Sequence, residues 1–168
     1  MGQAHAGPET VDLLYTPEER RRRDASRWTL VQGVLAPLQF LVFIVSALLV
    51  WRCLESGEGA FAAQLSVVLK TLVLYAIMVT GALWERDVFG RYLFARPFFW
   101  EDVVSMGVIF LHTAYLAALL TGWLGLRGQL ILALVAYAAY VVNAAQFLWK
   151  FRLARQTRPA EPQAIAEC

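Results

Sequence analysis

The sequence predicts an all-α, polytopic membrane protein with four transmembrane helices. Hydrophobic residues make up 59% of the 168 residues and charged residues only 17%, against about 45–50% and about 25% in soluble domains. A chain this short has too small a core to bury so much apolar surface. The composition therefore argues against a soluble enzyme and against a disordered chain.

Four apolar stretches have the length of a membrane span. They cover residues 30–50, 61–84, 103–124 and 129–149, and Lys70 is the single Asp, Glu, Lys or Arg within them. About 20 helical residues cross a hydrocarbon core of roughly 30 Å, and backbone groups in lipid must bond internally, which favours helices. We expect spans at about residues 29–51, 61–85, 101–124 and 129–150, and we expect Lys70 to pair within the bundle.

The placement of Lys and Arg predicts the orientation. Twelve of them lie in the N-terminal arm, in the connection between the second and third spans, and in the C-terminal tail, whereas the other two connections hold only Arg52 and Arg127. The positive-inside rule then places both termini in the cytoplasm. We expect a polar arm at residues 1–15, one transmembrane domain at 16–152 and a flexible tail at 153–168.

A helix start precedes the first span. Thr16 suits the N-cap, Pro17 the first helical position, and the acidic residues that follow suit the positive end of the helix dipole. We expect an interfacial amphipathic helix that runs through the arginines to Trp28, with no break between it and the first span. Its arginines would anchor the chain on anionic lipid; the alternative is a role in guiding substrate.

Polar residues recur at helical spacing on one face of each span. They are Gln32, Gln39 and Ser46 in the first, Thr71, Tyr75 and Glu85 in the second, Asp102, Ser105, His112 and Tyr115 in the third, and Tyr140, Asn143 and Lys150 in the fourth, with Gln146 close by. We expect these faces to meet inside the bundle. For the amides and hydroxyls, hydrogen bonds between helices explain the pattern as well as a functional site does.

Carboxylates gather at the cytoplasmic ends of the second and third spans. The four are Glu85, Asp87, Glu101 and Asp102. So many carboxylates at a low-dielectric boundary should not all be ionised, and a protonated acid beside an ionised one suits general acid–base catalysis. The alternative is an ion-paired loop that uses Arg86, Arg91 and Arg96. His112, about ten residues deeper, is either functional or bonded to a neighbouring helix.

Several other classes of function find no support. The only other histidine, His5, lies in the polar arm, which disfavours haem bound by two histidines, and no cluster has metal-ligand spacing beyond the acids. The sequence holds no Gly-rich phosphate loop, serine triad or CxxC motif. The basic residues outside the second span flank the spans and form no nucleic-acid-binding module, so we expect no nucleic-acid partner.

Several segments together resemble one enzyme family. They are residues 84–90 (WERDVFG), 92–95 (YLFA), 98–106 (FFWEDVVSM) and 112–115 (HTAY), with 14–22 (LYTPEERRR) and 143–150 (NAAQFLWK). The sequence resembles the vinyl bacteriochlorophyllide hydratase family over about residues 13–152. The resemblance implies a multi-pass enzyme of the bacterial inner or photosynthetic membrane. It would add water to the C3 vinyl group of chlorophyllide a, giving the 3-(1-hydroxyethyl) derivative, without a cofactor.

That expectation assigns roles to the polar residues. We expect Glu101 or Asp102 to donate the proton, and Glu85, or His112 with Ser105 and Tyr115, to position the water; His112 could instead ligate the magnesium of the substrate. Arg91 or Arg96 would bind the propionate of the chlorin. The remaining candidate substrate contacts are Phe98, Phe99, Trp100, Tyr75, Asn143 and Gln146. Other pathway enzymes or a second copy of the chain are possible partners.

Two other functions use the same residues differently. A non-catalytic chlorin carrier or assembly factor would need the aromatic side chains and His112 but no acid. A proton-coupled transporter would need an isolated carboxylate in the middle of a span, and the sequence has none. The acids at the cytoplasmic end therefore favour catalysis.

Overall fold

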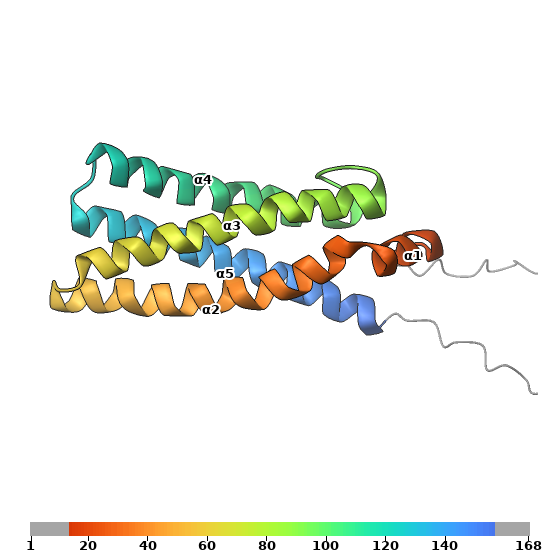
Figure 1. Cartoon of the computed structure of the whole chain (residues 1–168), viewed down its shortest axis with the longest axis horizontal. Helices are drawn as coiled ribbons and strands as arrows, with labels where there is room; N and C mark the ends of the chain where they lie inside the picture. Colours follow the sequence, from red (N-terminus) through yellow and green to blue (C-terminus); the bar gives the residue numbers. More distant parts are fainter. Residues whose placement is uncertain (1–13, 157–168) are drawn as a thin grey trace, which may run out of the picture.

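The chain folds into four long helices preceded by one short helix (Figure 1). The computed structural model describes residues 14–156, with side chains described as far as Leu153. The helices are α1 (Pro17–Ala25), α2 (Arg27–Ser56), α3 (Ala60–Phe89), α4 (Phe99–Thr121) and α5 (Leu126–Gln156), and a 3-10 turn, η1 (Arg96–Phe98), precedes α4. Most of the predicted arm and tail lies outside the described residues.

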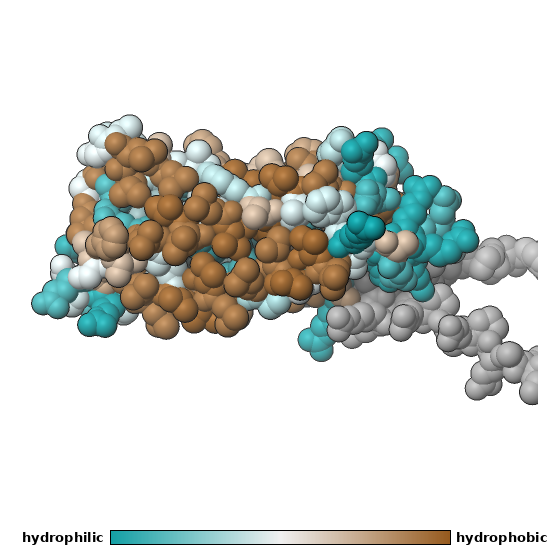
Figure 2. Space-filling model, in the orientation of Figure 1, coloured by the Kyte–Doolittle hydropathy of each residue, from teal (hydrophilic) through white to brown (hydrophobic). Residues whose placement is uncertain are grey.

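The prediction of four membrane-spanning helices is confirmed. Each of α2 to α5 is long and apolar enough to cross a membrane, and most extend a few residues past the predicted ends of the span. Apolar side chains cover the middle of the molecule, and polar ones gather toward its two ends (Figure 2). A helix bundle whose outer surface is apolar is matched to lipid rather than to water.

Two antiparallel hairpins make up the bundle. α2 packs mainly on α3 and α4 mainly on α5, and the hairpins meet through α2–α5, α3–α4 and α3–α5 contacts. The α2–α3 turn is short because Gly57 and Gly59 both adopt left-handed φ values, of 73° and 75°, which glycine does at no steric cost. The α3–α4 connection, residues 90–98, is longer and lies at the end that also holds α1 and the C-terminal end of α5 (Figure 1). We call this the loop end.

The expectation of a helix that continues into the first span is wrong. α1 begins as predicted, because Thr16 and Glu19 form a reciprocal capping box. It ends at Ala25, because Ser26 adopts an extended ψ of 128° and caps both helices. The Ser26 hydroxyl accepts the Trp28 N–H and donates to Asp87 on α3, 2.9 Å away, so a local side-chain bond competes successfully with helix continuation.

Tyr15 attaches the start of α1 to the bundle. Its ring is 5% exposed, stacks on Phe89 at 5.8 Å and lies beneath the Arg23 guanidinium. Burial raises the pKa of the Tyr15 hydroxyl to about 12, and the nearby Arg23 opposes that rise. α1 itself buries none of its side chains and carries charges along its length. α1 is therefore held at its two ends, by Tyr15 before it and by the Ser26–Asp87 hydrogen bond after it.

Candidate active site at the loop end

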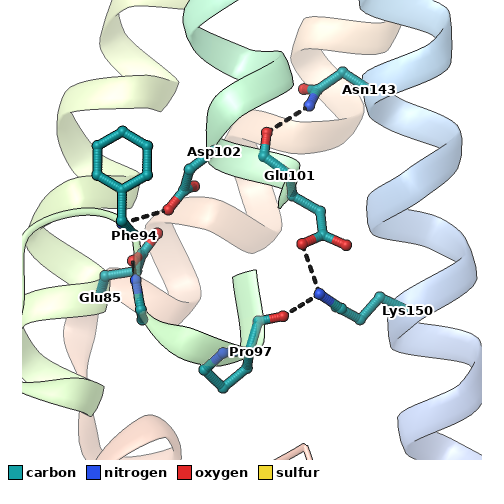
Figure 3. Close-up of polar contacts among 8 residues, drawn as sticks. Glu85, Phe94, Pro97, Glu101, Asp102, Asn143 and Lys150 are labelled. Atoms are coloured by element: carbon teal, nitrogen blue, oxygen red, sulfur yellow. Dashed lines mark hydrogen bonds and ion pairs between the residues drawn. The ribbon is translucent and has the colours of Figure 1, made fainter. Parts of the chain in front are cut away.

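Three of the four predicted acids are buried together at the loop end. Glu85 comes from the last turns of α3, and Glu101 and Asp102 come from the first turn of α4. Each is at most 7% exposed. The fourth, Asp87, lies on the outside, where it accepts the hydrogen bond from Ser26. Glu101 and Asp102 follow each other on one helix, so their side chains point to different neighbours (Figure 3).

Asp102 and Glu85 form a carboxyl pair beneath the α3–α4 connection. Their side chains lie close enough to interact electrostatically, and two like charges so close together favour a proton on one of the two. Asp102 also accepts the Phe94 N–H at 2.7 Å, and Glu85 accepts the Ala95 N–H at 3.2 Å. Phe94 adopts a φ of 60°, a conformation that costs about 1–3 kcal/mol for a residue other than glycine. The carboxyl pair thus holds a strained loop in place.

Glu101 turns the other way, toward α5. Its carboxylate accepts a 2.6 Å hydrogen bond from the ammonium of Lys150, which also donates to the Pro97 carbonyl (Figure 3). Asn143 donates to the Glu101 backbone carbonyl at 3.0 Å and accepts from Ser105 at 3.2 Å. We call Glu85, Glu101, Asp102, Asn143 and Lys150 the loop-end cluster. The buried Glu101 carboxylate is thus paired with a partly exposed ammonium, which offsets the cost of burying its charge.

A groove of about 450 Å³ opens beside Glu101. Its lining consists of Glu101, Val142, Ala145, Gln146, Trp149, Lys150 and Leu153. The volume lies in the range of small-molecule sites, which are mostly apolar with a few polar groups. Apart from Glu101, the lining residues come from one face of α5. The groove therefore presents one acid, one amide and one ammonium on an apolar wall.

A second group of buried polar residues lies in the middle of the bundle. Gln39, Lys70, His112 and Tyr115, from α2, α3 and α4, are each at most 2% exposed, and we call them the mid-bundle cluster. His112 is ten residues beyond Asp102, roughly 15 Å along the helix. Its Nδ1–H donates to the Val108 carbonyl at 2.8 Å, so Nε2 carries the free lone pair. The structure does not bring His112 and Tyr115 to the carboxylates.

A profile of the 2-vinyl bacteriochlorophyllide hydratase (BCHF) family matches residues 15–153. The chain belongs to this family. It is 64% identical over 148 residues to the 2-vinyl bacteriochlorophyllide hydratase of Rhodobacter capsulatus, covering 88% of this chain and 86% of the relative. It is 66% identical over 143 residues to the protein of the same name from Cereibacter sphaeroides, covering 84% and 88%. No solved structure matches the chain.

The segment shared with the family spans the site from end to end. It begins at Tyr15, the residue that docks α1, and ends at Leu153, the last residue that lines the groove. The loop-end cluster and the mid-bundle cluster both lie within it. The resemblance inferred from the sequence is therefore confirmed, and the match covers the bundle from Tyr15 to Leu153.

The other predicted site residues fall into two groups. Four of them are exposed at the loop end, where a ligand at the membrane surface could contact them: Arg91, Arg96, Phe99 and Trp100. Phe98 is 1% exposed and packs among aromatic rings that include Trp84 and Phe147, so its contacts are those of a core residue. Tyr75 bonds to Thr113 between α3 and α4, away from the groove.

Most of the groove wall has no role predicted from the sequence. Its members are Val142, Ala145, Trp149 and Leu153. A signal was present: positions 142, 145, 146, 149, 150 and 153 recur at the three- and four-residue spacing of one helical face. That face is largely apolar, as is every lipid-facing stripe. The sequence alone therefore cannot tell whether the face lines a groove or contacts lipid; the packing of α4 against α5 decides it.

Proposed function

We propose that this protein is a hydratase that adds water to the C3 vinyl group of chlorophyllide a or a related vinyl bacteriochlorophyllide. The product would be the 3-(1-hydroxyethyl) derivative. The observation that carries the proposal is the groove, in which a buried carboxyl borders an apolar wall in a member of this family. Hydration of a vinyl group is redox-neutral, so we expect the reaction to need no redox cofactor. The substrate carries its own magnesium.

The apolar surroundings suit a flat chlorin. The macrocycle would enter from the bilayer and place its vinyl edge in the groove, with Trp149, 72% exposed, offering a ring face. Its ionised propionate would stay at the membrane surface. Arg91 and Arg96, exposed in the α3–α4 connection at the same end, are the cations we propose for it.

Glu101 is the proton donor we favour, because it is the carboxyl that lines the groove. The Lys150 ammonium donates to Glu101 Oε2 at 2.6 Å, and we propose that transfer of this proton gives the protonated form of Glu101. Glu101 in its protonated form would protonate the terminal vinyl carbon, and conjugation with the macrocycle would stabilise the resulting cation. Water would then bond to the inner carbon and return a proton to Glu101, which closes the cycle. Over one cycle the vinyl group gains one water molecule, and Glu101 returns to its protonated form.

Asp102 and Glu85 have a different part in this proposal. The backbone N–H groups of residues 94 and 95 hold the two carboxyls beneath the α3–α4 connection, and neither carboxyl lines the groove. We propose that they hold the α3–α4 connection in the shape that forms the end of the site. Asp102 is the alternative donor if that connection opens when the substrate binds.

The test is a direct hydration assay. Purified protein in detergent, kept dark and anaerobic, receives chlorophyllide a and no cofactor, while a second sample receives the analogue whose vinyl group is reduced to ethyl. We expect a product heavier by one water, with its red absorption band shifted to the blue, from the vinyl substrate only. Pigment bound without conversion would replace the proposal with a chlorin carrier. Neither binding nor conversion would exclude both.

A further inference from the structure

Glu101 is held by α5 at two separate points. Lys150 donates to its carboxylate at 2.6 Å, and Asn143 Nδ2 donates to its backbone carbonyl at 3.0 Å (Figure 3). The two donors lie two helical turns apart on α5, so they share one side of that helix. One bond therefore fixes where the Glu101 backbone lies, and the other fixes where its carboxylate points.

The amide of Asn143 fits in one orientation only. A carbonyl oxygen can only accept a hydrogen bond, so Nδ2 must face Glu101, and Oδ1 then accepts the Ser105 hydroxyl at 3.2 Å. Glu101 lies in the first turn of α4, and Ser105 lies one turn further on. Helix ends fray, so bonds from a neighbouring helix matter most there. Asn143 thus fixes the start of α4 against α5.

Asn143 acts from behind the groove. It is 9% exposed, and the groove lining includes Glu101, Gln146 and Lys150 but not Asn143. A substrate that lies in the groove would contact the Glu101 carboxyl without reaching the Asn143 amide. The position of Asn143 therefore suits a residue that holds the acid rather than one that binds the substrate.

We infer that Asn143 is a positioning residue that keeps the Glu101 carboxyl aimed into the groove for proton transfer. The inference rests on the proposed hydration, in which Glu101 protonates the terminal vinyl carbon. A general acid must lie within hydrogen-bond reach of the atom it protonates, and a misplacement of about 1 Å can lower a rate about 100-fold. Without the Asn143 amide the start of α4 can shift against α5, and the Glu101 carboxyl shifts with it.

The test separates turnover from binding. Asn143→Leu has a similar shape and removes both hydrogen bonds. In the hydration of chlorophyllide a we expect it to lower kcat about tenfold or more, with KM and pigment binding within about twofold of wild type. Asn143→Ala also removes the amide and should give the same split between kcat and KM, so a folding defect in one variant does not decide the result.

Gln129→Leu is the matched control. Gln129 is 5% exposed, lies on α5 and donates from its amide to α4, at the Ala118 carbonyl. This contact is at the end of the bundle opposite Glu101 (Figure 1). We expect Gln129→Leu and Asn143→Leu both to lower resistance to unfolding by SDS, and Gln129→Leu to keep the wild-type kcat.

Three outcomes would overturn the inference and leave the proposed function standing. The first is wild-type kcat in both Asn143 variants. The second is a raised KM with kcat unchanged, which would make Asn143 a substrate contact. The third is an equal loss of kcat in Gln129→Leu, which would reduce the role of Asn143 to stability. No hydration by the wild type would overturn the proposed function, and this inference with it.

Discussion

The two buried polar clusters of this bundle differ in how completely their groups are bonded. In the loop-end cluster every carboxyl has a partner. Glu101 bonds to Lys150. Glu85 and Asp102 each accept a backbone N–H, and they lie beside each other. In the mid-bundle cluster, Lys70 Nζ, His112 Nε2 and both amide atoms of Gln39 lack hydrogen-bond partners in the described part of the chain. Burial alone therefore does not mark a site.

The difference follows from what each region contains. The loop end has a chain connection, and its free backbone N–H groups and carbonyls bond to side chains from α3, α4 and α5. The middle of the bundle has only helices, whose backbone groups already bond to one another. Lys70 there lies against a ring face, 3.8 Å from the centre of Tyr140. Catalysis needs groups held in one geometry, which the loop end provides.

The largest expected effect is on turnover. Glu101→Gln keeps the shape of the side chain and an oxygen for Lys150 but cannot donate an acidic proton, so we expect hydration to fall at least about 100-fold. Pigment binding should be unchanged. The same change at Glu55, exposed at the far end of α2, is the matched control and should leave the rate unaltered. Rates are measured by product chromatography after equal times.

Other outcomes would reassign the chemistry. Wild-type turnover by Glu101→Gln would exclude Glu101 as donor. A comparable loss in Asp102→Asn alone would move the donor to the carboxyl pair. A comparable loss in His112→Gln, with the fold retained, would give the mid-bundle cluster a catalytic role that its distance from the groove does not favour.

Much of the fold was predictable from the sequence, and the pairing within the site was not. The four long apolar helices and the N-cap at Thr16 depend on local physics, and both are confirmed. The break at Ser26 depends on a bond to Asp87, 61 residues away, and the partner of Glu101 depends on how α4 packs against α5. Spacing placed Glu85, Glu101 and Asp102 at one end, but it could not say that Glu101 turns to Lys150 while Asp102 turns to Glu85.

The next effect is a pair of stability changes with opposite signs. Lys70→Met removes an ammonium that costs about 2.5–3.5 kcal/mol to bury in a membrane and gives up a cation–π contact of about 0.5–2 kcal/mol. We therefore expect a gain of about 1 kcal/mol in the free energy of unfolding. Lys150→Met leaves Glu101 buried without its partner, and we expect a loss of about 2 kcal/mol or more. Unfolding by SDS in mixed micelles measures both.

This pair compares the two clusters directly, because the substitution is the same. If Lys70→Met destabilised the protein as much as Lys150→Met does, the mid-bundle ammonium would be fully satisfied in the native state. If Lys150→Met were neutral, the ion pair with Glu101 would contribute nothing to stability. Either result would remove the distinction between the clusters.

The smallest expected effect is on stability and concerns the buried hydroxyl of Tyr15, whose ring packs on Phe89. Its oxygen has no hydrogen-bond partner among residues 14–156, so Tyr15→Phe should change stability by less than about 0.5 kcal/mol at pH 8. At high pH the variants should separate. The folded protein holds the Tyr15 proton up to about pH 12, whereas an exposed tyrosine loses it near pH 10.

The sign follows from proton binding. Between pH 10 and pH 12 the folded state binds more protons at Tyr15 than the unfolded state does, so wild-type stability falls as pH rises through this range. Tyr15→Phe has no such proton to lose, so its thermal midpoint should fall less between pH 8 and pH 11. Equal falls in the two proteins would mean that the hydroxyl reaches water and that Tyr15 does not hold α1 by a buried contact. A smaller fall in the variant would show that the Tyr15 hydroxyl is buried and neutral in the folded protein, as its contact with Phe89 and Phe98 implies.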